Sequence, residues 1–144
     1  MTNSVIKNKP FFQPIISTDV TLLFLRIGFG TLIFINHGFE KLFNFNHMLE
    51  VFPNPLSIGK FPSLIFALIA DGICSILIIL GLFTRISTML IFINLLVALI
   101  IIHQANFTEI HGELAAIYLM ITLILFCYGP GNMSLDKAIS DYKN

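Results

Sequence analysis

The sequence predicts an all-α protein, a bundle of four transmembrane helices with short cytoplasmic termini. Hydrophobic residues make up 56% of the 144 residues and charged residues only 11%, against roughly 45–50% and 25% in soluble domains. The apolar residues gather into four long segments, and a helix of about 20 apolar residues is enough to cross a bilayer. These segments leave no room for a soluble domain, so we expect the lipid bilayer to surround the chain.

Hydropathy places the four spans in order along the chain. The second and third nearly merge, because apolar sequence continues over 61–102, and a single helix of that length would be about 63 Å long. The chain must therefore turn at Gly81–Arg85, where Gly81 can end one helix and Thr84 can cap the next. The predicted spans are about Val20–Leu42, Pro62–Phe83, Ile86–His103 and Glu113–Gly129.

Positively charged residues are divided unequally between the two sides of this predicted bundle. Five lie on the side of the termini and two on the other, which by the positive-inside rule places both termini in the cytoplasm. We therefore divide the chain into a cytoplasmic segment 1–18, a membrane domain 19–130 and a cytoplasmic tail 131–144, in which Ser134 can start a short helix. The apolar loop over 43–61 is expected to lie on the membrane surface or to dip into the bundle.

The first span carries ionisable residues, and so does the second. A charge in hydrocarbon costs roughly 2.5–3.5 kcal/mol on insertion scales, so such residues usually face a protein interior. At about 100° per residue, Arg26, His37 and Glu40 share one side of the first helix with Gly30 and Ile33. We expect this seam to line a cavity or a buried polar network.

Topology brings further polar residues to the outer end of this seam. His103 ends the third span, and His111 and Glu113 lie at the start of the fourth, so all three should converge with His37 and Glu40 on one membrane face. We predict a polar pocket formed by His37, Glu40, His103 and Glu113. It could bind a quinone head group or relay protons, it could hold a metal ion, although no diagnostic ligand spacing is present, or it could be a structural hydrogen-bond network.

Arg26 and Asp71 form a second candidate unit. Their backbone heights in the membrane differ by roughly 7 Å, which an arginine side chain can span, and pairing would lower the cost of burying both charges. We predict a buried charge pair that is either structural or controls access of protons or anions. Asn94 in the third span could join this pair, but it points away from His103, nine residues on, so the two are not expected to line the same cavity.

Several function classes find no support in the sequence. The formal net charge is zero and no cluster of Lys and Arg is present, so nucleic acid is not an expected partner. Cys74 and Cys127 lie far apart in apolar segments, which does not indicate a redox pair. Neither a dinucleotide fingerprint nor a convincing pair of haem ligands is present, so we do not expect the isolated chain to be catalytic.

A set of short motifs, taken in order, resembles the DoxX family of small bacterial membrane proteins over about residues 19–138. The resemblance implies a four-helix bundle in the bacterial inner membrane and association with membrane redox or oxidative-stress complexes. The family takes its name from a subunit of a terminal quinol oxidase that is also linked to thiosulfate–quinone oxidoreduction. The motifs are Arg26, His37-Gly38-Phe39-Glu40-Lys41-Leu42-Phe43, Asp71 (more often Glu in the family), Gly81–Arg85, His103, Glu113, Gly129-Pro130-Gly131 and Ser134-Leu135-Asp136.

From the residues and the resemblance together, we expect an accessory or quinone-interacting subunit of a membrane redox complex. Its partner would be a membrane or soluble redox protein, and it could also form a homo-oligomer. One alternative is a small-molecule or ion transporter, which would need an oligomer because four helices enclose too small a pore. Another is a membrane scaffold without pocket chemistry.

Overall fold

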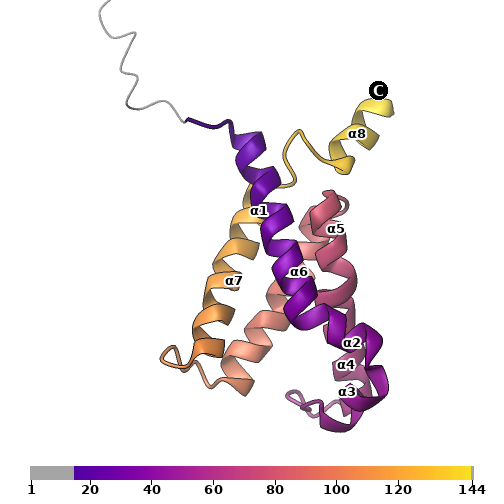
Figure 1. Cartoon of the computed structure of the whole chain (residues 1–144), viewed down its shortest axis with the longest axis vertical. Helices are drawn as coiled ribbons and strands as arrows, with labels where there is room; N and C mark the ends of the chain where they lie inside the picture. Colours follow the sequence, from indigo (N-terminus) through magenta and orange to yellow (C-terminus); the bar gives the residue numbers. More distant parts are fainter. Residues whose placement is uncertain (1–14, 144) are drawn as a thin grey trace, which may run out of the picture.

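The computed structural model describes residues 15–143, and every regular element within this range is a helix (Figure 1). Most of the predicted cytoplasmic segment 1–18 therefore lies outside the described residues. The elements are α1 (Thr18–Ile33), η2 (Phe34–Gly38), α2 (Phe39–Phe43), α3 (Phe45–Val51), α4 (Lys60–Leu68), η3 (Ile69–Cys74), α5 (Ser75–Leu80), α6 (Thr84–Val97), η4 (Ala98–Ile102), α7 (Ile110–Tyr128) and α8 (Leu135–Tyr142).

Four continuous helices in the described range are long and apolar enough to cross a membrane. This confirms the predicted fold class, and the helix ends lie within a few residues of the predicted ones. The four helices are Thr18–Phe43, Lys60–Leu80, Thr84–Ile102 and Ile110–Tyr128.

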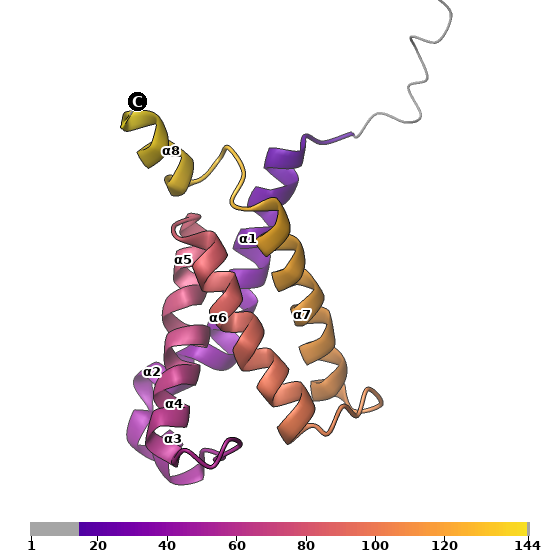
Figure 2. The same ribbon diagram turned by 180° about the vertical axis from the view of Figure 1, so that it is seen from behind.

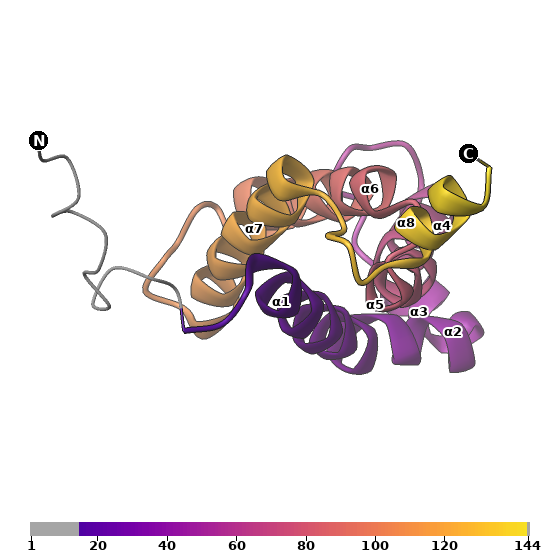
Figure 3. The same cartoon turned by 90° about the horizontal axis from the view of Figure 1, so that it is seen from above.

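The four helices alternate in direction. α1 packs along α5 and α6 packs along α7. The start of α1, the α5–α6 turn and α8 lie at one end of the bundle, whereas α2, α3 and the connection into α7 lie at the other (Figures 1 and 2). Seen along the bundle, the two packed pairs stand beside each other (Figure 3).

The turn between the second and third helices is where the sequence predicts it. Gly81 follows α5 with a positive φ of 70°, and a Cβ atom at this residue would collide with the guanidinium group of Arg26. The predicted cap is wrong, however, because Asp136 takes that role. Its carboxylate accepts hydrogen bonds from the backbone N–H groups of Phe83 (2.8 Å) and Thr84 (3.1 Å), and Thr84 is already the first residue of α6.

Three of the four membrane-length helices contain a π-helical turn, namely η2, η3 and η4. A π-helical turn closes its hydrogen bonds over five residues instead of four. Each such turn adds one residue and rotates the rest of the helix by about 100° relative to an uninterrupted α-helix. The side chains that follow therefore face directions that α-helical periodicity does not predict.

The bundle has a continuous apolar core and an apolar outer surface. The core cluster includes Phe29, Ile33, Ile78, Ile91 and Leu125, while large side chains such as Phe24, Ile86 and Met120 are more than half exposed. Apolar patches of this extent on a single chain mark a surface that another apolar phase covers. Here that phase is the lipid bilayer.

Candidate functional site

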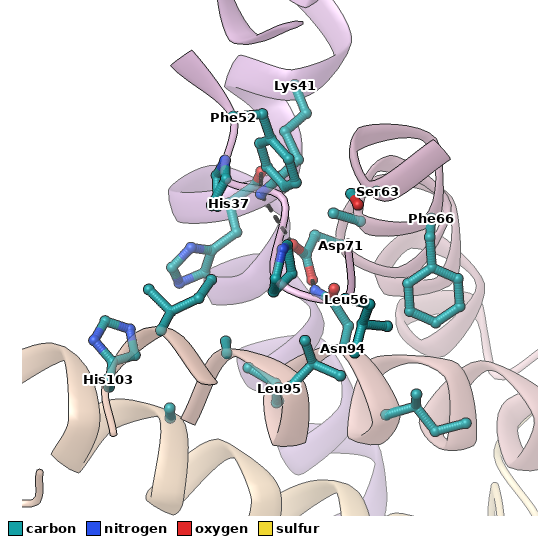
Figure 4. A pocket seen from close by; sticks show the side chains of 18 of the residues that line it. His37, Lys41, Phe52, Leu56, Ser63, Phe66, Asp71, Asn94, Leu95 and His103 are labelled. Carbon is teal, nitrogen blue, oxygen red and sulfur yellow. Dashed lines mark hydrogen bonds and ion pairs between the residues drawn. The ribbon is translucent and has the colours of Figure 1, made fainter. Parts of the chain in front are cut away.

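A cavity of about 580 Å³ lies at the end of the bundle formed by α2, α3 and the connection into α7. Its walls come from all four membrane-length helices and from the loop that follows α3, and most of them are apolar (Figure 4). Of the two placements expected for the 43–61 loop, on the membrane surface or dipping into the bundle, the second agrees with its residues in the cavity wall, such as Phe52 and Leu56. The apolar lining residues include Phe52, Leu56, Ile58, Phe66, Leu95 and Leu114, and the polar ones are His37, Lys41, Ser63, Asp71, Asn94, His103, His111 and Tyr118.

A buried ion pair lies in the cavity wall. The ammonium group of Lys41 is 3.0 Å from Oδ2 of Asp71, and these residues are only 8% and 4% exposed. Asn94 donates a hydrogen bond of 2.9 Å to Oδ1 of the same carboxylate. Asp71 is thus held from two sides by residues of the first and third helices, as Figure 4 shows. Lys41 also donates to the backbone oxygen of His37 at 2.7 Å.

Three histidines from different elements line another part of the cavity. His37 lies edge-on to Tyr118 with ring centroids 6.4 Å apart. His103 stacks on His111 at 6.0 Å with an angle of 10° between the rings. Among the residues that the structure describes, no three His, Cys, Asp or Glu side chains are placed to hold a metal ion together.

The family assignment follows from the sequence comparison. The sequence model of the DoxX family matches residues 21–104, more than half of the chain. The chain belongs to the DoxX family. No curated protein and no solved structure matches it. The matched range contains the three π-helical turns and the Lys41–Asp71–Asn94 unit, whereas His111 lies beyond it.

The cavity of this DoxX protein contains two of the four predicted pocket residues. His37 and His103 line it, but Glu40 and Glu113 are exposed and do not. For Glu40 the reason is the π-helical turn η2, which shifts the inward face by one residue so that Lys41 takes the expected place of Glu40.

Glu113 lies outside the cavity for a different reason. The buried residues near the start of α7 are Gly112, Ala115 and Tyr118, three residues apart. Glu113 follows Gly112 by one position and so turns away from this face. The neighbouring His111, which lies at the same end of α7, supplies a polar side chain to the cavity instead.

The predicted pair of Arg26 and Asp71 is wrong as a pair, although both residues are buried. Arg26 points toward the other end of the DoxX bundle, where its Nη2 donates to the backbone oxygen of Met133 at 2.6 Å. Long basic side chains extend toward the nearer polar end of a membrane protein, which removes Arg26 from the reach of Asp71.

The expectation that Asn94 and His103 face different directions is also wrong, because both line the cavity. The π-helical turn η4 lies between them, and the helix ends just before His103. Lys41 was missed for the same kind of reason. Charge balance could have found it, because the buried carboxylate of Asp71 needs a positive partner. Lys41 is a candidate for that partner, since the end of the first span and the start of the second span lie on the same side of the membrane.

Proposed function

We propose that this DoxX protein is an accessory subunit of a membrane redox complex that binds a quinone in the cavity. The observation that supports this best is a cavity of about 580 Å³ with mostly apolar walls and a few polar groups. Small-molecule sites usually measure about 300–1,000 Å³ and have this composition, because apolar walls supply the affinity and the few polar groups fix the orientation.

The chemistry of the lining suits a quinone head group. The ring is apolar on both faces and carries carbonyl oxygens that accept hydrogen bonds. Phe52, Phe66 and Leu95 offer contacts for the ring, and Lys41 and Asn94 offer N–H donors for the carbonyl oxygens. The exposed apolar residues of the adjacent loop, Leu56 and Ile58, suit an isoprenoid tail that remains in the bilayer.

We assign the transfer of electrons to a partner protein. The sequence carries neither a dinucleotide fingerprint nor a Cys-x-x-Cys motif, so the chain would hold the quinone while the partner oxidises or reduces it. The localisation that we propose is the bacterial inner membrane. The excess of Lys and Arg on the side of the termini supports cytoplasmic termini, with the cavity toward the outer leaflet.

Purification of the tagged protein from native membranes in mild detergent tests this function. Mass spectrometry should identify a bound quinone and a redox protein in the same fraction. An Ala98→Phe variant should lose the quinone, because Ala98 lines the cavity and the larger side chain fills it. The matched control is Ala116→Phe, since Ala116 is similarly half-buried but does not line the cavity.

Recovery of the protein with neither a quinone nor a redox partner would contradict the proposal. Equal quinone content in the two phenylalanine variants would contradict the assignment to this cavity.

A further inference from the structure

We propose that the cavity selects uncharged ligands and that Lys41 recognises them by donating a hydrogen bond to a ligand carbonyl oxygen. The inference rests on the proposed function and narrows it to the class of head group that the site accepts. The Lys41–Asp71 pair selects ligands by their charge, and Lys41 binds the carbonyl group of the ligand.

The charges around the cavity cancel. Of the described residues that line it, Lys41 and Asp71 are the only ones of the types Lys, Arg, Asp and Glu, and they neutralise each other at 3.0 Å. An anion that enters loses its hydration and finds no net positive charge in exchange, and burial of an unpaired charge is strongly unfavourable. An uncharged head group does not meet this penalty.

The hydrogen-bonding capacity of the pair points to an acceptor on the ligand. A lysine ammonium group has three donors and no acceptor. Lys41 donates to the backbone oxygen of His37 and to Asp71, so one N–H remains for the cavity that Lys41 lines. Both carboxylate oxygens of Asp71 already accept a hydrogen bond, one from Lys41 and one from Asn94.

The geometry also keeps Lys41 in place. Asp71 of the second helix accepts from the ammonium group of Lys41, and Asn94 of the third helix holds Asp71 in turn (Figure 4). A donor that is already oriented binds a ligand without a further loss of side-chain freedom. Lys41 is therefore a specificity-determining residue, and Asp71 and Asn94 position it.

The test compares two probes on the protein in lipid nanodiscs at about pH 8, well above the reference pKa of imidazole. One probe is an uncharged decyl-benzoquinone, and the other is a decyl-hydroxynaphthoquinone that is ionised at this pH. The native protein should bind the uncharged probe at least about tenfold more tightly than the anion. Asp71→Asn keeps the shape of the side chain but gives the cavity a charge of +1, so it should reduce this preference by about tenfold or reverse it.

The double variant Lys41→Met with Asp71→Leu separates the two roles, because neither new side chain carries a charge or an N–H donor. It keeps the cavity uncharged but removes the donor, so the uncharged quinone should bind about tenfold more weakly. A decylbenzene without carbonyl groups should bind the native protein and the double variant equally. Asp141→Asn is the control for a change of net charge, because Asp141 is exposed on α8, and it should leave the preference unchanged.

The outcomes separate this inference from the proposed function. If neither quinone binds the native protein, the proposed function fails. If both bind with equal affinity, or the anion binds more tightly, the cavity is a quinone site but the selection of uncharged ligands is wrong. The comparison on the native protein decides this even where a variant does not fold.

Discussion

Among the described residues, Lys41 is the basic residue that forms a buried ion pair. Lys41 and Asp71 form an ion pair that is almost fully removed from solvent, and Asn94 completes it. A buried pair of this kind adds little net stability compared with apolar residues, but loss of one partner leaves the other charge without compensation. The pair should therefore be sensitive to single substitutions and tolerant of a joint one.

Lys41→Met should destabilise the protein by about 3–5 kcal/mol, because it leaves Asp71 charged and unpaired. The double variant with Asp71→Asn should recover most of that loss. Unfolding in detergent, followed by circular dichroism, measures both. Lys137→Met is the control, since Lys137 pairs with Asp141 at 45% and 60% side-chain exposure and exposed pairs contribute about 0–1 kcal/mol. Equal losses in the two lysine variants would show that Lys41 is not held in a buried pair.

For single residues, the sequence predicts which polar side chains are buried in the bundle better than it predicts which of them contact each other. His37, His103 and Asp71 were singled out because polar residues in apolar spans are rare, and all three line the cavity. The pairing of Arg26 with Asp71 was wrong because hydropathy gives the height of a residue but not the direction in which a long side chain extends.

At the scale of elements, the first two helices approach each other closely beside the ion pair. A Cβ atom at Gly38 would lie 2.5 Å from the backbone oxygen of Asp71 and 2.9 Å from Cα of Gly72. Small residues at such positions let helix backbones pack tightly in membranes. The contact involves Asp71 itself and lies three residues before Lys41, so it brings the two charged side chains within reach of each other.

Gly38→Ala should therefore destabilise the bundle by about 1–3 kcal/mol, since neither backbone can move aside easily. Gly28→Ala is the matched control in the same helix, because a Cβ atom at Gly28 meets nothing within 4 Å. That variant should be neutral or stabilised by up to about 1 kcal/mol. Thermal unfolding in detergent measures both, and a neutral Gly38→Ala would contradict the close packing of these helices.

The segment 132–136, which leads from the loop after α7 into the first turn of α8, connects three parts of the bundle end. Asn132 donates two hydrogen bonds to Asp19, Met133 accepts one from Arg26, and Asp136 accepts from the start of α6. Unpaired N–H groups at the start of a helix favour a carboxylate partner. The tail thus fixes the α5–α6 turn relative to α1.

Asp136→Asn should loosen this connection, because hydrogen bonds to a charged group contribute about 1.5–3 kcal/mol. Hydrogen–deuterium exchange of the peptide that contains Phe83 and Thr84 should become at least about tenfold faster. Asp141→Asn on the same short helix should leave that exchange unchanged. If the two variants exchange alike, Asp136 does not cap α6.

Hydropathy predicts where each membrane helix begins and ends, but it does not predict which face of the helix points into the bundle. The helix ends were predicted within a few residues because the bilayer imposes a length on each apolar segment. The π-helical turns left no such signal, since they change the pitch of a helix and not its apolar character. Glu40 was therefore expected where Lys41 lies, and Asn94 was expected to turn away from the cavity that it lines.

At the scale of the whole molecule, the bundle has polar residues in two regions, one at each end. One end holds Arg26 and the tail segment that contacts it, and the other holds the cavity with its ion pair and histidines. The sequence predicts the four-helix architecture because few other folds satisfy backbone hydrogen bonds in lipid. The cavity could be predicted only in part. His37 and His103 were expected in it, but which residues of the loop after α3 form its wall depends on tertiary packing.

A quinone site in the cavity can be tested by photo-crosslinking in native membranes. The probe is a quinone that carries a photoreactive group on its ring, and mass spectrometry maps the labelled residues. We expect labelled peptides from the cavity wall, namely those over 37–41, 52–58 and 94–103. An excess of unmodified quinone should prevent this labelling. Labelling confined to the outer apolar surface, at residues such as Phe24, Met89 and Met120, would contradict a quinone site in the cavity.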